Sequence, residues 1–287
     1  MKRVNSLNRN LIQRLGFTFL TLVAVATVLP IIGVVIYILL QGAPAISWEF
    51  LSGFPRQGMR AGGILPAILG TLYLTLGTAI FAVPIGIAAA IYLSEYAPEN
   101  RWTRLIRIAI INLAGIPSVV YGLFGLGLFV LFLKFGTSLL AASLTLSIMT
   151  LPVIISTAEE ALRAVPQAFR TVSISLGGTR WQTIQRIVLP QALPGILTGV
   201  ILGLERAAGE TAPILFTGAA FFLPRLPHSP FDATMALPYH LFVISTQVPE
   251  MPLQIQYGTA LVLLVFVLSM NLIATIIRSR ARAKRQW

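Results

Sequence analysis

Long apolar runs alternate with short polar stretches along the chain, and each run is long enough to form a membrane-crossing helix. A helix needs about 20 residues to span the hydrocarbon core of a bilayer. Runs of this length occur at residues 15–40, 64–93, 105–133, 138–158, 192–218 and 257–277. We therefore predict an all-α integral membrane protein, with six transmembrane helices in a single domain that covers residues 1–287.

Prolines are expected to bend two of these spans. Pro84 lies inside the second run and Pro117 inside the third. Proline has no backbone N–H, and its ring clashes with the carbonyl one turn earlier in a helix. The sequence leaves open whether such bends serve gating or only the packing of the helices.

The composition agrees with a membrane protein and excludes several kinds of functional site. Hydrophobic residues make up 56% of the chain and charged residues 10%, with a mean hydropathy of +0.84. Soluble domains carry about 25% charged residues. There is no cysteine and there are only two histidines, which excludes disulfides and thiolate nucleophiles and argues against a histidine-based metal site. We therefore expect neither a metal site nor catalytic residues in this chain.

The basic residues are distributed unevenly between the two sides of the predicted membrane domain. Sixteen lie on one side, in the N-terminal tail and at 101–107, 163–186 and 278–285. The other side holds four, and they are Arg56, Arg60, Lys134 and Arg225. Positively charged loops stay in the cytoplasm, so we predict that both termini are cytoplasmic. The net charge of +12 therefore reflects membrane topology, and no nucleic-acid partner is expected.

The first apolar run has two interpretations. Its basic flank, including Arg9 and Arg14, also suits a secretory signal peptide. However, the apolar part of a signal peptide measures about 7–15 residues, and the run at 15–40 is much longer. We favour a retained transmembrane helix.

The polar segment 159–190, between the fourth and fifth runs, has the pattern of two short amphipathic helices. Apolar residues recur at helical spacing before and after Gly177–Gly178–Thr179. Glycine commonly follows the last residue of a helix and threonine commonly precedes the first, so these residues predict a tight turn. Pro190 is expected to end the second helix. The pair could lie on the membrane surface or could dock a cytoplasmic partner.

Three ionisable residues, Glu205, Arg206 and Glu210, lie inside the fifth apolar run. A charge at the centre of a bilayer costs about 2.5–3.5 kcal/mol on insertion scales, so such residues need compensation. Arg206 and Glu210 are four residues apart and can pair on one helix face. We make no prediction for Glu205.

Small residues in the same run predict where this helix packs. Gly195, Gly199 and Gly203 recur every four residues, which lets another helix approach closely. At about 100° per residue, Arg206 projects within about 20° of Gly199. The charges are therefore expected to face protein or a cavity, away from lipid.

The charged pair also has two interpretations. Arg206 and Glu210 could simply neutralise each other and lock the helix bundle. A buried ion pair is often no more stabilising than apolar packing, which weakens that explanation. Alternatively, Arg206 faces the path of an anion, because its planar guanidinium can donate two parallel hydrogen bonds to an oxyanion. We favour a substrate path that includes Arg206, Glu210 and Thr211.

Several motifs are missing, and their absence limits what this chain can do alone. No G-x-x-x-x-G-K-[ST] phosphate-binding loop occurs, and we find no G-x-S-x-G or H-E-x-x-H motif. We therefore expect no enzyme activity and no cofactor on this chain. The segment 219–256 is apolar but interrupted by prolines, so we predict an external, non-spanning segment.

The segment 159–190 resembles the EAA loop, with which permease subunits of bacterial ABC importers dock on their ATPase. Nine residues after Gly177, the chain has Ile-Val-Leu-Pro at 187–190. The family has an acidic residue and two alanines where this chain has Thr171, Val172 and Ser173, so Thr171 is assigned no acidic contact to the ATPase. The resemblance implies an ATPase-coupling surface made of Ser173, Leu176, Gly177, Gly178, Trp181, Ile187, Leu189 and Pro190.

Three further stretches, at 62–75, 115–127 and 206–217, resemble the phosphate-specific permeases of this family. The last, RAAGETAPILFT, resembles the PstA subunit more than its PstC partner. The resemblance implies a phosphate path, and the arginine known to be essential in this motif falls at Arg206. A permease for sulfate, molybdate or phosphonate remains an alternative, as does a membrane scaffold that senses phosphate without forming a pore.

The resemblance also implies partners and a location. The expected partners are a PstC-like second permease, a PstB-like ATPase dimer that binds ATP and Mg²⁺, an external PstS-like phosphate-binding protein and the lipid bilayer. The fold is then of the ABC importer permease type, multi-pass in the bacterial inner membrane, with the coupling helix pair between spans four and five.

Overall fold

The computed structural model describes residues 6–283, and most of them are helical. The long helices are α1 (Ser6–Gly42), α3 (Leu65–Ile91), α4 (Arg101–Ala114), α6 (Leu139–Arg163), α9 (Leu189–Gly209) and α12 (Leu253–Ala283). The short helices are α2 (Trp48–Ser52), α5 (Ser118–Gly125), α7 (Gln167–Ser175), α8 (Arg180–Thr183), α10 (Ala212–Thr217) and α11 (Leu237–Thr246). The 3-10 turns are η1 (Ala43–Ala45) and η2 (Gln57–Met59), and the wider π turns are η3 (Tyr92–Tyr96), η4 (Leu126–Phe132) and η5 (Ile184–Val188).

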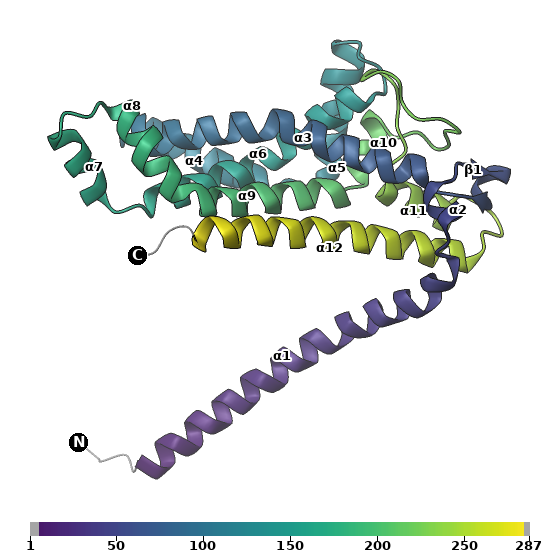
Figure 1. Cartoon of the computed structure of the whole chain (residues 1–287), viewed down its shortest axis with the longest axis horizontal. Coiled ribbons are helices and arrows are strands. Elements are labelled where there is room, and N and C mark those ends of the chain that lie inside the picture. The colour runs from purple at the N-terminus through teal and green to yellow at the C-terminus, as the bar shows by residue number, and fades with distance from the viewer. Residues whose placement is uncertain (1–5, 284–287) are drawn as a thin grey trace.

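Four long helices, α3, α6, α9 and α12, run side by side, with α6 packed against both α3 and α9 (Figure 1). Helix α6 supplies much of the core, and its Leu146, Met149 and Ile154 are at most 1% exposed. Most buried hydroxyls on α3 and α6 donate to carbonyls one turn earlier, as Thr78 Oγ1 does to Leu74 O at 2.7 Å, whereas Ser143 Oγ has no partner among the described residues. Because these polar groups are satisfied locally, the two helices can pack closely in an apolar setting.

Glycines on α9 determine how closely this helix approaches α6. A Cβ atom added at Gly199 would overlap the side chain of Thr157, and one at Gly195 would lie 2.5 Å from Ala161 Cβ. At Gly203 the nearest atom would be Ile154 Cγ1, at 3.1 Å. The three glycines therefore form the face of α9 that contacts α6, which is the close helix approach that small residues allow.

Replacing Gly199 with valine should destabilise the bundle. The added methyl groups need space that Thr157 occupies, and overpacking of this kind costs about 1–3 kcal/mol. We expect a lower midpoint of thermal unfolding in detergent, measured by intrinsic fluorescence. The matched control is Gly33→Val in α1, where an added Cβ meets nothing within 4 Å and the helix-propensity change is the same. Equal midpoints for the two variants would contradict this packing role.

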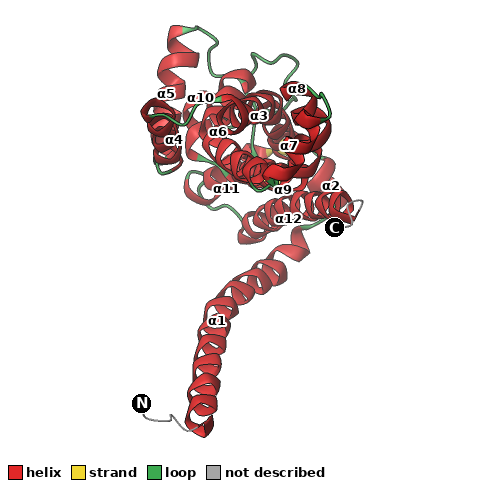
Figure 2. Ribbon diagram, turned by 90° about the vertical axis from the view of Figure 1, so that its left-hand side faces the viewer, coloured by secondary structure: helices red, strands yellow, loops and turns green. Residues whose placement is uncertain are grey.

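Helix α1 leaves the bundle and touches it only near its C-terminal end (Figure 1, Figure 2). There Tyr37 packs edge-on against Tyr257 of α12, with ring centroids 5.5 Å apart. The other apolar side chains of α1 are largely exposed, including Phe17 and Leu20. Its residues 13–45 form a candidate membrane span with no buried residues in its most apolar window.

The third predicted span, 105–133, is not one continuous helix in the structure. Helix α4 ends at Ala114, and α5 with η4 continues from Ser118 at an angle of 101°. Pro117 precedes α5 with extended backbone geometry, because proline cannot donate the hydrogen bond that would continue α4. Among the described residues five helices are long and apolar enough to span a membrane, or six if this bent pair counts as one span. By contrast, α3 continues through Pro84 without a break.

The segment 219–256 packs onto one end of the bundle. Its helix α11 has ten residues, too few to span a bilayer. Leu237 N–H donates to Thr71 Oγ1 of α3 at 2.8 Å, and His240 is 2% exposed. Burial lowers the pKa of His240 to about 4. The segment is thus anchored in the core, next to a small hairpin formed by β1 (Pro55–Arg56) and β2 (Ala61–Gly62).

Helices α7 and α8 lie at the opposite end of the bundle from the hairpin and α11 (Figure 1). The first turn of α1 and the last turn of α12 point toward the α7–α8 end. This arrangement agrees with a topology in which both termini and the helix pair share one side of the membrane. Lys2, Arg3, Lys284 and Arg285, on which the predicted orientation partly depends, lie outside the described residues.

Candidate functional site

The charged residues of the fifth apolar run lie where that run breaks. Helix α9 ends at Gly209, and Glu210 is extended with φ −75° and ψ 139°. A short helix, α10, starts at Ala212, with Pro213 in its first turn. Proline at this position has no N–H to donate to the carbonyl of Gly209, so α9 cannot continue through it with its hydrogen bonds intact. The predicted span 192–218 is therefore wrong at its C-terminal end, because two helices share it.

Arg206 and Glu210 form an ion pair across this break. Arg206 Nε lies 3.4 Å from Glu210 Oε1. Their side chains are 35% and 17% exposed. The interaction at four-residue spacing is thus present although Glu210 is no longer helical. The exposed part of the Arg206 guanidinium leaves N–H donors available to another acceptor.

Arg206 is next to the part of α9 that packs against the rest of the protein. Ala207 and Ala208, which follow it, are buried. Helix α5 packs against the start of α10, where a Cβ atom added at Gly122 would lie 3.0 Å from Pro213 Cα, and the Tyr121 hydroxyl of α5 donates to Leu113 O at 2.7 Å. Thr211 follows Glu210 in the connection between α9 and α10. The structure therefore brings Arg206, Glu210 and Thr211 together beside the start of α5.

Glu205 occupies a different position from its charged neighbours. Its Oε1 atom is buried, and it has no hydrogen-bond partner among the described residues. It forms no ion pair with Arg206, in agreement with the about 100° that separates consecutive side chains on a helix.

The predicted helix pair is present, joined by a tight turn. Gly177 has φ +84°, a left-handed conformation that favours glycine. Its N–H donates to Ile174 O at 2.9 Å, and that of Gly178 donates to Ser173 O at 3.0 Å. These two bonds complete a Schellman motif, which satisfies the last carbonyls of α7.

The second helix of the pair begins with a capping box. Thr179 Oγ1 accepts from Gln182 N–H at 3.2 Å, and Gln182 Oε1 accepts from Thr179 N–H at 2.9 Å. Ser173 Oγ lies 2.8 Å from Thr183 Oγ1, which ties α7 to α8. The turn and its two helices therefore form one hydrogen-bonded unit.

The expectation that Pro190 ends this second helix is wrong. Residues 180–209 form one continuous helical segment, so α8 runs through η5 into α9. The Leu189 N–H donates to Ile184 O, five residues earlier. Such a π turn widens the helix just before the proline and accommodates both its missing N–H and its ring. The loop is also shorter than the predicted segment 159–190, because residues 159–163 form the last turn of α6.

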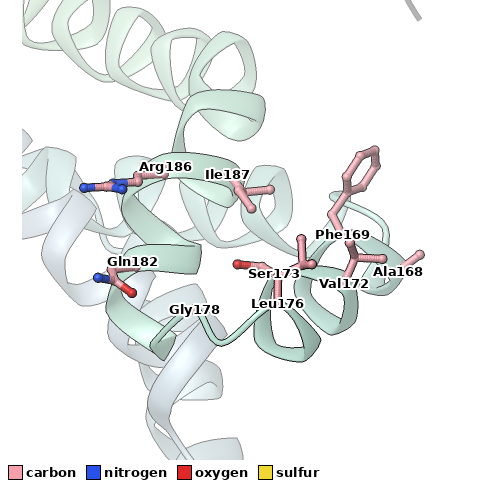
Figure 3. Close-up of a pocket in the computed structure, with 9 residues that line it drawn as sticks. All are labelled: Ala168, Phe169, Val172, Ser173, Leu176, Gly178, Gln182, Arg186 and Ile187. Atoms are coloured by element: carbon pink, nitrogen blue, oxygen red, sulfur yellow. The ribbon is translucent and has the colours of Figure 1, made fainter.

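An apolar pocket of about 470 Å³ lies between α7 and the helix that starts at α8 (Figure 3). We call it the coupling groove. Four of the predicted coupling residues, Ser173, Leu176, Gly178 and Ile187, line it. Its other lining residues are Ala168, Phe169, Val172, Gln182 and Arg186.

The remaining predicted coupling residues lie around the groove. Trp181 is 54% exposed, and Gly177 forms the turn at one end. Leu189 packs against the buried cluster beneath the groove, and Pro190 follows it at the start of α9. Among these residues, Trp181 is thus exposed at the surface, whereas Leu189 anchors the helix to the buried cluster.

Helix α7 exposes several of its apolar side chains, whereas an amphipathic helix usually buries them. Its apolar Val172, Ile174 and Leu176 are exposed, and Leu176 reaches 84%. The buried residue of α7 is Arg170, whose guanidinium contacts Glu95, while Phe169 is partly buried against a core cluster. The apolar periodicity identified α7 correctly but gave no indication of Arg170 and Glu95. These residues are 75 positions apart, so no local pattern connects them.

The described residues contain no group of three or more histidine, cysteine, aspartate or glutamate side chains that could hold a metal ion. Among the described acidic residues that are not exposed, Glu95, Glu159 and Glu210 each pair with an arginine, and Asp232 accepts hydrogen bonds from the backbone N–H groups of His228 and Ser229. Within the part of the chain that the structure describes, Glu205 has neither kind of partner at its buried Oε1 atom.

Comparisons with known proteins agree with this architecture. Residues 82–283 match the family described as "binding-protein-dependent transport system inner membrane component". The probable ABC transporter permease protein YqgI of Bacillus subtilis is 32% identical over 282 residues, which cover 93% of this chain and 95% of the relative. The phosphate transport system permease protein PstA 1 of Mycobacterium tuberculosis is 34% identical over 293 residues, which cover 98% of this chain and 92% of the relative.

Solved structures show the same fold at lower sequence identity. A bacterial alginate ABC transporter, in complex with an alginate-bound periplasmic protein, matches with a TM-score of 0.64 and 17% identity, over 96% of this chain and 99% of that chain. The MetNI methionine ABC transporter, in an inward-facing conformation, matches with a TM-score of 0.62 and 17% identity, over 76% of this chain and 95% of that chain. The chain therefore belongs to the family of binding-protein-dependent transport system inner membrane components, as a multi-pass permease subunit of an ABC importer.

Proposed function

We propose that this permease subunit imports inorganic phosphate, as the PstA-type member of a phosphate-specific ABC importer. The observation that carries the proposal is the partly exposed Arg206, paired with Glu210 where α9 breaks. A guanidinium at this depth needs a compensating role, because an arginine within a membrane span is expensive. An anion that passes the break can accept hydrogen bonds from the donors that Glu210 does not use.

The chemistry of arginine suits this cargo. Its planar guanidinium can donate two parallel hydrogen bonds to adjacent oxygens of phosphate. Glu210 orients the guanidinium in the absence of cargo and can release it to phosphate, while Thr211 offers a hydroxyl beside the same break. In this mechanism the ion pair is a resting state, and the anion replaces the carboxylate as it passes.

The relatives support phosphate over other cargo. The relative from Mycobacterium tuberculosis is named a phosphate transport system permease and matches nearly the whole chain. A PstA phosphate permease of Mycobacterium leprae is 37% identical over 219 residues. The methionine and alginate transporters share the fold at 17% identity, and at that level they support no choice of substrate.

The coupling groove supplies the connection to an energy source. We propose that an apolar element of a PstB-like ATPase dimer occupies it, with ATP and Mg²⁺ bound by that dimer. A PstC-like permease completes the path, and a PstS-like protein delivers phosphate to the end formed by α11 and the hairpin. Both termini then lie in the cytoplasm, on the side of α7 and α8.

Competition for uptake tests the substrate. Right-side-out vesicles that contain the complete transporter and are loaded with ATP should accumulate labelled phosphate, and excess unlabelled phosphate should abolish the signal. Excess sulfate, molybdate or phosphonate should leave it unchanged. Equal competition by one of these anions would instead favour a permease for another oxyanion. An assembled complex that accumulates no anion would favour the non-pore scaffold.

A further inference from the structure

Three arginines from three different elements converge on the π turn η3, at the end of α3. Arg170 of α7 pairs with Glu95. Arg107 of α4 donates to Leu93 O at 2.8 Å. Arg180 of α8 lies over the ring of Tyr96, with its guanidinium carbon 5.2 Å from the ring centroid. No part of the proposed substrate path or coupling groove accounts for this cluster, which we call the η3 junction.

The contact between Arg170 and Glu95 is the strongest of the three. Arg170 Nε donates to Glu95 Oε2 at 3.1 Å and Nη2 to Oε1 at 2.6 Å, a bidentate geometry. The same guanidinium donates to Val165 O at 2.7 Å and to Leu162 O at 2.9 Å. The side chains are 11% and 8% exposed. One buried cation therefore joins the start of α7, the end of α6 and the end of α3.

The second contact extends the junction to α4. Arg107 Nε lies 2.7 Å from Glu159 Oε1 of α6, and Arg163 Nε lies 3.1 Å from the same oxygen. Because Arg107 also bonds to Leu93 O, it joins α4 and α6 to η3. Through Arg107, η3 is therefore in contact with both neighbouring helices.

The chain itself connects α7 and α8 only to α6 and α9. Helix α6 leads into α7, and α8 continues into α9. Glu95 of η3 and Arg170 of α7 are 75 residues apart in the sequence, so α7 reaches η3 only through non-covalent contacts. Arg170 and Arg180 come from both arms of the helix pair, and both contact η3. Buried, bidentate ion pairs hold their geometry because separating them leaves an uncompensated charge.

The geometry points to the η3 junction as a second mechanical connection in the transport cycle. Movement imposed on α7 and α8 by the ATPase reaches α3 and α4 through Arg170, Glu95 and Arg107, in addition to the direct route into α6 and α9. Arg170 and Glu95 are positioning residues, because neither lies on the substrate path. This inference rests on the proposed ATPase coupling through α7 and α8, and it does not depend on which anion is carried.

Uptake and ATP hydrolysis by the reconstituted transporter test the junction. A polar pocket of about 300 Å³ adjoins it, lined by Glu99, Arg163 and Arg180 among others, so water can solvate Arg170 when its partner is neutralised. We expect Glu95→Gln to assemble with the ATPase and to hydrolyse ATP at the wild-type rate. Uptake per ATP hydrolysed should fall at least about fivefold, the lower end of typical coupling between distant sites.

Two further variants separate coupling from folding. The exchange Glu95→Arg with Arg170→Glu should restore part of the lost uptake, because it rebuilds the pair with opposite polarity. The matched control is Glu49→Gln, which removes an ion pair at the surface. The side chains of Glu49 and Arg56 in that pair are 69% and 71% exposed. This variant should behave as wild type. Wild-type uptake per ATP in Glu95→Gln would overturn the proposal, as would a fall in uptake and hydrolysis by the same factor.

Distances between spin labels test the movement without any cargo. The natural chain has no cysteine, so two labels can be placed cleanly at Leu76→Cys of α3 and Leu268→Cys of α12, both exposed positions. In the complete complex, vanadate-trapped and nucleotide-free states should give different label distances, and Glu95→Gln should abolish that difference. An identical difference in both proteins, or none in the wild type, would refute the inference even if phosphate is the cargo. If the difference depends on Glu95 but phosphate is not taken up, only the substrate assignment fails.

Discussion

Replacing Arg206 with alanine is expected to reduce phosphate uptake by at least about 100-fold. The substitution removes two charge-assisted hydrogen bonds to the anion, each contributing about 1.5 kcal/mol or more, and about 1.4 kcal/mol corresponds to a factor of ten. Arg206→Lys keeps the positive charge but loses the planar fork, so its uptake should lie between those of alanine and wild type. Whole-cell accumulation of labelled phosphate measures both effects.

Controls separate the anion path from stability. Arg206→Ala leaves Glu210, 17% exposed, without its cation, and an unpaired buried charge can destabilise a protein. The double variant Arg206→Ala with Glu210→Gln removes that charge and should still be inactive, while assembling normally with its partners. Arg14→Ala, at an exposed position of α1, should transport as wild type. Normal uptake by Arg206→Ala would show that the pair only locks the bundle.

Replacing Gly177 with valine is expected to uncouple ATP hydrolysis from transport. Gly177 has φ +84°, and an added Cβ would meet nothing within 4 Å. The effect therefore comes from the backbone alone, because a β-branched residue is strongly disfavoured in the left-handed region. Loss of the Schellman bonds from Gly177 and Gly178 should change the angle between α7 and α8, and with it the coupling groove.

Asparagine at the same position provides the matched control. Among residues other than glycine, asparagine adopts the left-handed conformation most readily, so Gly177→Asn should retain most of the coupled transport. Both variants should insert into the membrane normally, as judged by yield and by detergent-solubilised monodispersity. Reconstituted vesicles give ATP hydrolysis and uptake side by side. Coupled uptake by Gly177→Val at the wild-type level would contradict the role of this turn.

Local patterns predicted much of the helix pair and of the charged break. The Gly177–Gly178–Thr179 turn, the small-residue stripe on α9 and the pairing of Arg206 with Glu210 all involve groups within five residues of one another or one face of one helix. Backbone conformational preferences and helical periodicity act over this distance. Such features can be predicted without knowledge of the tertiary structure.

Features that depend on segments far apart in the sequence were missed or predicted incorrectly. The bend expected at Pro117 is present, with 101° between α4 and α5, but the one expected at Pro84 is not, because α3 continues through that residue without a break. Pro190 was expected to end a helix that instead continues through η5. The strength of a proline's effect depends on whether neighbouring helices and π turns can satisfy the freed carbonyls, and only packing determines that.

The sequence by itself determined that this is a helical membrane protein with a capped helix pair and an arginine inside a span. These properties follow from hydrophobic run length and from interactions within one or two turns. Only the tertiary structure decided that α7 buries Arg170 and exposes Val172 and Ile174, and that Arg170 pairs with Glu95, 75 residues away in the sequence. An ionised side chain inside a bundle needs a partner of opposite charge, and which partner it finds is set by how distant helices pack.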